Sequence, residues 1–308
     1  MNAKSNVANV ATIMQRPLWL ALAAAALALS LSPTLGVADD RTDPVNAVEA
    51  AVNLRLSAFG LTPDQRLVRF PIAVPQVARS VGKISNLAAP DTALIGIDFR
   101  VQDGKLYGVG NAGGIYTIDT ATAVATLSPA SPLDIAFDAG VKAFGVDFNP
   151  TANALRIITD TGQNLRHPFG TGATQFVTQN DTTLSYPPAA PPATGLSGAA
   201  YTNNDLDTTT GTTLLDIDAM RNQVAIQSPA NNGLLVPTGA LTVDAEAPIG
   251  FDIYPALTNG KAVRNSGFAS LTVGGQPGLY RINLTTGEAN FIGSFFDKVV
   301  DIALPLNQ

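Results

Sequence analysis

The chain has 308 residues, of which 46% are hydrophobic and 14% charged, and its 18 basic and 24 acidic residues give a formal net charge of −6. This acidic balance argues against binding to nucleic acid or to anionic membrane surfaces, both of which attract basic proteins. The chain contains no cysteine, which excludes thiol catalysis, Cys-ligated zinc and a lipid anchor on an N-terminal cysteine.

Residues 1–38 have the features of a signal peptide. Lys4 and Arg16 supply positive charge, residues 18–31 form an apolar run, and residues 36–38 match a small-x-small cleavage pattern. The run is short and Ala-rich for a membrane span. We expect cleavage after Ala38, no membrane span in the mature protein, and a location in the periplasm or outside the cell. An uncleaved N-terminal anchor is the alternative.

Residues 39–57 are predicted to form a linker with one short helix. Asp43 can cap this helix, Pro44 suits its first position, and Val45, Val48, Val52 and Leu56 share one face. From residue 58 to residue 308, short alternating runs are separated by Gly, Pro, Asn and Asp, which is typical of an all-β domain with many short strands.

These strands repeat with a period of about fifty residues. A strand that opens on a small residue and carries an aspartate in most copies begins at residues 96, 145, 198, 250 and 299. A second pattern, which predicts another strand, a turn and a third strand, occurs at residues 114–127, 164–178, 213–227 and 278–293. Its fifth copy, at residues 66–84, lies at the opposite end of the chain from the strand that begins at residue 299.

A four-stranded repeat whose terminal pieces complete one unit predicts a five-bladed β-propeller closed by N- and C-terminal strands in a shared blade. An open β-solenoid could have the same period but would not need complementary ends. The proline-rich residues 186–194 are predicted to connect blades two and three in an extended conformation. Residues 260–275 are interpreted as an insertion in blade four, and a sixth blade would follow if the stretch up to residue 278 contained extra strands.

Several of these stretches resemble a known family. Residues 94–100, 104–107, 145–150, 155–157, 161–166, 278–283 and 286–287 resemble the domain-of-unknown-function family 4394, and the resemblance extends from about residue 54 to residue 306. It implies an exported, propeller-like domain and no assigned activity, so it transfers no catalytic residue. The third copy departs from its own repeat at Ala200, where other copies carry aspartate.

One aspartate occupies the same place in four of the five repeats, at Asp98, Asp147, Asp252 and Asp301. These carboxylates could line the axial channel and hold a hard cation such as Ca²⁺. Alternatively, and this is the interpretation we favour, each accepts hydrogen bonds from backbone N–H groups of its own or the next blade. A pair of them could also provide the acid and base of a glycosidase.

Two other sets of residues are candidates for a site. Arg156, Gln163, Asn164 and Arg166 could form a polar patch that recognises a sugar or a peptide, or they could belong to a turn between strands. His167 is the only histidine. It could be a general base, but its repeat equivalents are polar and of mixed charge, so we expect it on a strand face turned to solvent.

The functional hypothesis is an exported, non-catalytic binding or scaffolding propeller, expected to be monomeric, with an extracytoplasmic ligand or protein as its partner. No cofactor is implied other than Ca²⁺ at the aspartates. The alternative is a propeller hydrolase directed at a glycan or a lactone, assisted by Ca²⁺ and using the axial carboxylates.

Overall fold

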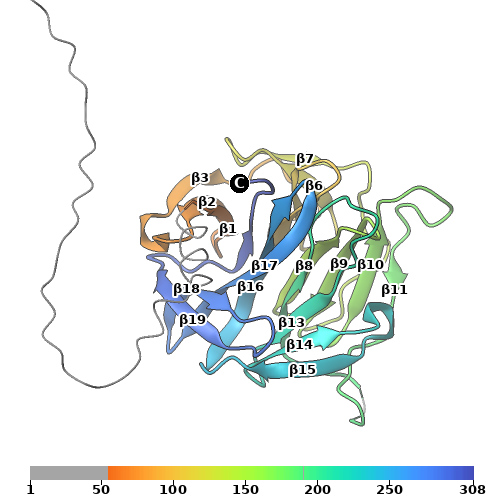
Figure 1. Cartoon of the computed structure of the whole chain (residues 1–308). Coiled ribbons are helices and arrows are strands. Elements are labelled where there is room, and N and C mark those ends of the chain that lie inside the picture. Colours follow the sequence, from red (N-terminus) through yellow and green to blue (C-terminus); the bar gives the residue numbers. More distant parts are fainter. Residues whose placement is uncertain (1–54, 190) are drawn as a thin grey trace, which may run out of the picture. The chain divides into compact units, whose positions relative to one another are not determined.

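The computed structural model describes residues 55–189 and 191–308, which form five four-stranded antiparallel sheets arranged as the blades of a β-propeller (Figure 1). The prediction of five blades is confirmed. The predicted signal peptide lies outside the described residues, and so does the predicted helix apart from its last three residues. Of these, Arg55 lies in a turn and Ser57 begins the first strand. In the described ranges, no helix is long and apolar enough to span a bilayer.

Each blade has one inner strand, next to the axis, and three strands that follow it outward. The blades are, in order, β4 (Leu94–Phe99), β5 (Leu106–Gly110), β6 (Ile115–Ile118) and β7 (Ala125–Leu127); β8 (Phe144–Asn149), β9 (Ala154–Thr159), β10 (Asn164–Pro168) and β11 (Gln179–Asn180); β12 (Leu196–Tyr201), β13 (Leu214–Asp218), β14 (Gln223–Gln227) and β15 (Leu235–Ala240); β16 (Ala245–Thr258), β17 (Lys261–Val273), β18 (Gln276–Ile282) and β19 (Ala289–Ser294); and β20 (Asp301–Ala303), β1 (Ser57–Leu61), β2 (Arg66–Pro71) and β3 (Arg79–Lys83). Each inner strand contacts the inner strands of the two neighbouring blades.

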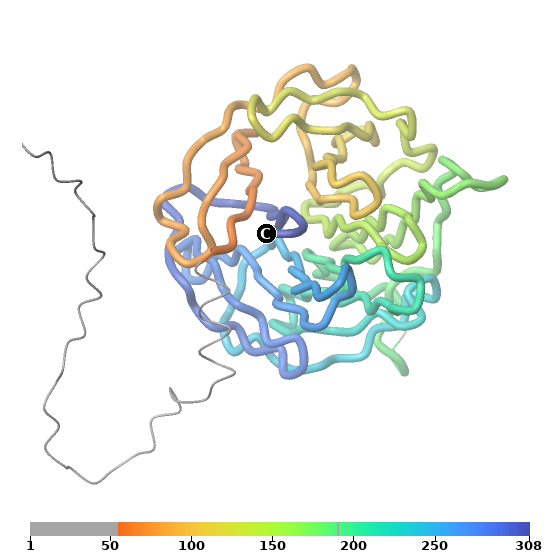
Figure 2. Tube along the Cα trace, turned by 45° about the horizontal axis from the view of Figure 1, so that its top comes forward, coloured from red at the N-terminus to blue at the C-terminus, as the bar shows by residue number. Residues whose placement is uncertain are grey.

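The fifth blade contains strands from both ends of the described chain, as predicted. Its inner strand β20 pairs with β1, so that Phe59 lies opposite Ala303 and Leu61 lies opposite Asp301. Figure 2 shows the C-terminal segment close to the centre of the ring, inside the N-terminal strands. The sequence interpretation missed β1, because it placed the first strand of the domain at Arg66 and assigned none before it.

The repeated glycines lie where inner strands of adjacent blades approach each other. A Cβ on Gly145 would lie 2.7 Å from the backbone nitrogen of Ala199, and a Cβ on Gly250 would lie 2.5 Å from the Cα of Asp301. Both contacts are with backbone, which cannot rotate away as a side chain can. The glycines at the starts of the second and fourth repeats are therefore a packing requirement of the ring.

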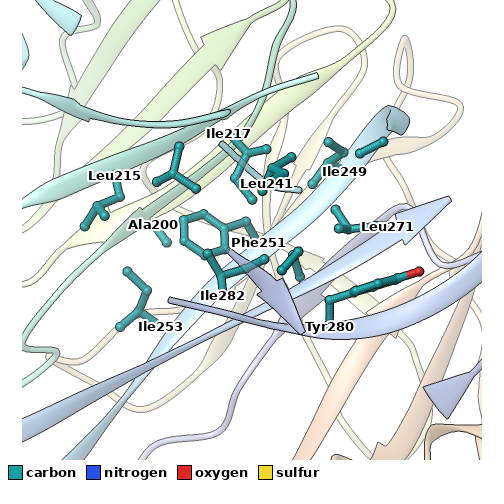
Figure 3. Close-up of a cluster of buried hydrophobic side chains, with 14 residues drawn as sticks. Ala200, Leu215, Ile217, Leu241, Ile249, Phe251, Ile253, Leu271, Tyr280 and Ile282 are labelled. Carbon is teal, nitrogen blue, oxygen red and sulfur yellow. The ribbon is translucent and has the colours of Figure 1, made fainter. Parts of the chain in front are cut away.

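The hydrophobic core is divided into five layers, one between each pair of adjacent blades. Figure 3 shows the layer between blades three and four, where Leu215 and Ile217 of β13 face Phe251 of β16. Leu214, which alternates with them along the strand, belongs to the layer between blades two and three. Because successive strand residues point to opposite faces, each strand contributes to two layers and can be apolar on both sides.

In blade three, the alignment of the repeats was wrong. Residues 213–218 were aligned with third strands of other blades, but they contain β13, which is a second strand. The third strand is β14, and the fourth strand, β15, was not predicted. The error arose because β13 and the third strand β18 have similar patterns, with buried leucine and isoleucine around polar positions.

In blade four, the predicted insertion is also wrong. Residues 260–275 contain β17, the second strand, which pairs with β16 on one side and with β18 on the other. This stretch has four glycines and two serines among its 16 residues and resembles a loop until its two partners are known. Because β17 completes blade four, it also removes the alternative of a sixth blade. Residues 186–189 and 191–194 form a connection without strands between blades two and three, as predicted.

Candidate metal centre at the propeller axis

The four repeated aspartates lie on inner strands of four different blades: Asp98 on β4, Asp147 on β8, Asp252 on β16 and Asp301 on β20. All are buried, with between 1% and 7% of their surface exposed. On β8, the flanking residues Val146 and Phe148 pack into the layer shared with the preceding blade. The alternation of the strand therefore turns Asp147 toward the following blade.

Each of the four carboxylates accepts a hydrogen bond from a backbone N–H of the next blade. The four N–H···O bonds run from Phe148 to Asp98 (2.8 Å), from Tyr201 to Asp147 (3.1 Å), from Leu304 to Asp252 (2.6 Å) and from Ile97 to Asp301 (2.7 Å). Asp98, Asp252 and Asp301 also accept a bond from the N–H of the residue that follows them. The interpretation of these aspartates as repeated structural acceptors is confirmed.

Blade three is the exception at Ala200, which has no side chain that can accept such a bond. Here Ser197 Oγ, on the same inner strand, accepts a 2.9 Å hydrogen bond from the backbone N–H of Ile249 in blade four. A serine three residues earlier thus joins blades three and four in place of the missing aspartate.

Asp98, Asp147 and Asp252 form a tight group. Each offers one carboxylate oxygen, and these three oxygens all lie within 4.8 Å of one another. Burial raises the pKa of Asp98 and Asp147 well above the ordinary range, and repulsion from the other axial carboxylates adds to the shift. Burial also raises the pKa of Asp301, and it raises the pKa of Asp252 to about 6. The group can therefore hold protons or a cation at the axis.

One oxygen in this group differs from the rest. Asp147 Oδ2 is buried and has no hydrogen-bond partner, whereas Asp147 Oδ1 accepts the N–H of Tyr201. Both oxygens of Asp98, Asp252 and Asp301 have backbone donors. A buried acceptor without a donor is costly, and among the oxygens of the four aspartates Asp147 Oδ2 alone bears that cost.

The predicted polar patch lies in the interior, between blades two and three. Arg156 is 2% exposed and donates hydrogen bonds to Asn164 Oδ1 (2.7 Å), Asp181 Oδ2 (2.8 Å) and Asn231 Oδ1 (2.7 Å). The half-buried Arg166 binds both carboxylate oxygens of Asp181. Asp181 and Asn231 were not predicted, because their distance from Arg156 in the sequence carries no signal of contact.

Gln163 lies apart from this network. Its side-chain oxygen accepts from the N–H of Asp138, and its side-chain nitrogen donates to the carbonyl of Ala136. The fold therefore brings together Arg156, Asn164 and Arg166 but uses Gln163 to fix a separate loop.

His167 is fully buried, which corrects the expectation of a solvent-facing side chain. The registers of blades one and two align it with Ile118, a buried position, instead of Thr117. Its Nε2 lies 2.9 Å from the carbonyl oxygen of Ala130, so this nitrogen must carry the proton, and Nδ1 accepts from Thr178 Oγ1. Burial lowers the pKa of His167.

Residues 66–303 match the family model of the domain of unknown function DUF4394. No curated protein matches the chain significantly. Among solved structures, the chain is similar to the glutaminyl cyclase of Myxococcus xanthus, with 15% identity, 68% of this chain and 69% of that chain covered, and a TM-score of 0.34. It is also similar to the hydrazine synthase of Kuenenia stuttgartiensis, with 11% identity, 68% of this chain and 52% of that chain covered, and a TM-score of 0.39.

At these identities the likeness concerns the fold alone, and the chain spans about half of the hydrazine synthase chain that it matches. The family match covers most of the sequence, including the inner strands that carry the four axial aspartates. This protein therefore belongs to the DUF4394 family, a family of unknown function.

Proposed function

We propose that the protein is an exported, non-catalytic propeller that binds a polar ligand or serves as a scaffold outside the cytoplasm. The observation that carries this proposal is the use of the axial carboxylates: each is buried and accepts a backbone N–H of the next blade. A general acid or base has to reach its substrate, and these groups contact their neighbours in the ring instead. The export part rests on the sequence of residues 1–38.

A cleft on blade four supplies a surface for such a ligand. It has a volume of about 570 Å³ and lies beside β17, β18 and the turn that leads to β19. Polar side chains dominate its lining, namely Asn265, Ser266, Arg281, Asn283, Thr285 and Asn290. Asn265 is bonded to Asn203, and Asn283 Oδ1 accepts from the N–H groups of Thr285 and Thr286. The exposed amide of Asn290 and the hydroxyl groups of the cleft offer further donors and acceptors, which suit the hydroxyl groups of a sugar or the backbone of a peptide.

Blade one provides a matched surface for comparison. Thr117 and Thr126 pair across β6 and β7 as Arg281 and Asn290 pair across β18 and β19, and they line a smaller cleft of about 400 Å³. This cleft lacks the amide and guanidinium groups of the blade-four cleft at these two positions. It should bind the same ligand less well or not at all.

The test is a binding screen of the purified mature chain against oligosaccharides and peptides, followed by calorimetry on the strongest hit. We expect Asn290→Ala to weaken binding about tenfold, because one good hydrogen bond to a ligand is worth about 1.4 kcal/mol. Thr126→Ala should leave it unchanged. Equal effects of the two substitutions would remove the blade-four cleft from the proposal.

A hydrolase that uses the axial carboxylates is the second candidate, favoured by the pKa of about 6 for Asp252. A carboxyl group that titrates near neutral pH is suited to general acid catalysis. Turnover of a glycan or a lactone that Asp252→Asn abolishes, while the protein stays folded, would establish this alternative and overturn the non-catalytic proposal.

A further inference from the structure

We propose that Asp98, Asp147 and Asp252 form a binding site for one Ca²⁺ ion on the propeller axis. This inference goes beyond the proposed function and does not depend on it, since a cation at this place would stabilise the ring whatever the ligand or partner is.

The spacing of the three carboxylates fits one coordination sphere. Ca²⁺ binds oxygen at 2.3–2.6 Å, so two ligands on opposite sides of the ion lie about 4.6–5.2 Å apart. The three oxygens contributed by Asp98, Asp147 and Asp252 all lie within 4.8 Å of one another. Mg²⁺ binds at 2.0–2.1 Å and would draw such oxygens to within about 4.2 Å. Mg²⁺ also keeps several waters and usually binds only one or two carboxylates, so three carboxylates in one group favour Ca²⁺.

The ligand chemistry favours a hard cation. The three side chains offer oxygen only, which Ca²⁺ and Mg²⁺ prefer and which Zn²⁺ uses less than nitrogen and sulfur. The only histidine, His167, is bonded to Thr178 and to the carbonyl of Ala130. The carboxylates would supply three of the oxygens that Ca²⁺ requires, and water or backbone carbonyls would supply the rest.

Asp147 provides the independent observation. Its Oδ2 has no hydrogen-bond partner, and no water can replace one easily because the residue is only 1% exposed. The other oxygens of the three carboxylates already accept a backbone N–H. A carboxylate oxygen has two lone pairs, so an N–H bond to one leaves the other for a cation. An ion that binds Asp147 through Oδ2 would thus satisfy the unpartnered oxygen without breaking any bond between blades.

The charge of the group points in the same direction. The charges that act on Asp147 are those of the other axial aspartates, and like charges this close repel one another. Two positive charges placed among them would convert the repulsion into attraction. The three blades that carry Asp98, Asp147 and Asp252 would then be tied to one centre.

The first experiment uses the wild-type chain, freed of metal with a chelator and dialysed to equilibrium against CaCl2. We expect one bound Ca²⁺ per chain and a melting temperature that rises with free Ca²⁺, by the same step for each tenfold increase above the dissociation constant. MgCl2 at the same concentration should give a smaller rise. Wild-type protein that neither retains Ca²⁺ nor changes its melting temperature would overturn the proposal without any variant.

Asp147→Asn is the most informative substitution. Its Oδ1 can keep the hydrogen bond from Tyr201, and its amide nitrogen takes the place of the unpartnered oxygen, so the bond between blades two and three survives. In chelator we expect it to melt at or above the wild-type temperature, because one repelling charge has been removed. The rise in melting temperature caused by Ca²⁺ should be lost.

The control is Asp297→Asn, which removes a carboxylate that is 61% exposed and paired with Arg66 at the surface. It should keep the full response to Ca²⁺. If the axial carboxylates hold protons instead of a cation, Asp147→Asn will raise the melting temperature, and Ca²⁺ will not change the melting temperature of the wild type or of the variant. That pattern, or a Ca²⁺ response that survives in Asp147→Asn, contradicts the proposal.

Discussion

Asp301 Oδ2 accepts a 2.7 Å hydrogen bond from the backbone N–H of Ile97, and this bond joins the last blade to the first across 204 positions of sequence. The same type of bond joins blade one to blade two, through Asp98 and Phe148. Ring closure therefore uses the interaction that also holds successive blades together. Since β20 is the inner strand of blade five, the C-terminal segment closes the ring.

Deletion of residues 299–308 should abolish the cooperative unfolding transition. It removes β20, leaves one edge of β1 unpaired and removes Val299, Ile302 and Leu304 from the layer between blades four and five. Thermal unfolding followed by circular dichroism will test this. Removal of Asn307 and Gln308 alone, which costs exposed bonds to Ser57 and Pro305 and the contact with Tyr254, should lower the midpoint slightly. A ten-residue deletion that keeps the full transition would contradict the shared blade.

Gly250→Ala should destabilise the protein by about 1–3 kcal/mol, the usual cost of overpacking. The new Cβ would lie 2.5 Å from the Cα of Asp301 and 2.7 Å from the nitrogen of Ile302, so two inner strands would have to separate. Gly211→Ala is the matched control, because no atom lies within 4 Å of its Cβ position. Urea unfolding should show a change of less than about 0.5 kcal/mol for Gly211→Ala, and similar losses for both variants would refute the explanation of the repeated glycine.

Arg156→Met should cost about 3–5 kcal/mol, because removal of one partner leaves buried polar groups without compensation. It would take the guanidinium from Asn164, Asp181 and Asn231. Arg166→Met removes a second, more exposed arginine from the same Asp181 and should cost no more than about 1 kcal/mol. Chemical denaturation of the two variants and the wild type measures how much each substitution lowers the free energy of unfolding. If the two variants lose equal stability, the buried network does not tie blade two to blade three.

Asp216→Asn should stabilise the protein at neutral pH but not in acid. Asp216 is fully buried, neither carboxylate oxygen has a hydrogen-bond partner, and burial raises its pKa well above the ordinary range. Between the unfolded pKa of about 3.9 and the higher folded pKa, the folded state holds more protons, so stability falls as pH rises through this window. Asparagine does not titrate and avoids that loss.

The measurement for Asp216 is the unfolding midpoint as a function of pH for wild type and variant. The two curves should meet in acid and separate toward neutral pH, with the variant above. Asp119→Asn should show the opposite sign, because hydrogen bonds from the backbone N–H groups of Ala121 and Thr122 lower the pKa of Asp119. If the curve for Asp216→Asn runs parallel to that of the wild type at all pH values, ionisation of Asp216 does not destabilise the folded protein.

The repeats made the ring predictable from sequence because the geometry of the axis is the same in every blade. Gly145 and Gly250 recur because backbone approaches backbone there, and Asp98 and Asp147 recur because each accepts an N–H of the next blade. These are local requirements that each repeat has to meet. They appear as periodic residues, and they allowed both the number of blades and the shared blade to be inferred.

The outer strands were less predictable. β13 resembles a third strand and β17 resembles a loop, since the composition of a strand reflects burial on its two faces and not its rank in the blade. Only the pairing of β17 with β16 and β18 identifies it as a strand of blade four. The expectation for His167 failed because the sequence alignment of the repeats matched it with Thr117, whereas the strand registers match it with the buried Ile118.

The sequence by itself determined the five-bladed ring, its closure by the two ends and the family, because a periodic fold imposes periodic residues. Only the tertiary structure decided what the candidate residues do. It turned Arg156, Asn164 and His167 inward and left Asp147 Oδ2 without a donor. It also brought one carboxylate oxygen each of Asp98, Asp147 and Asp252 to within 4.8 Å of one another. The physical reason is that the period is a property of one chain segment, whereas burial, repulsion and coordination arise from atoms that distant blades place side by side.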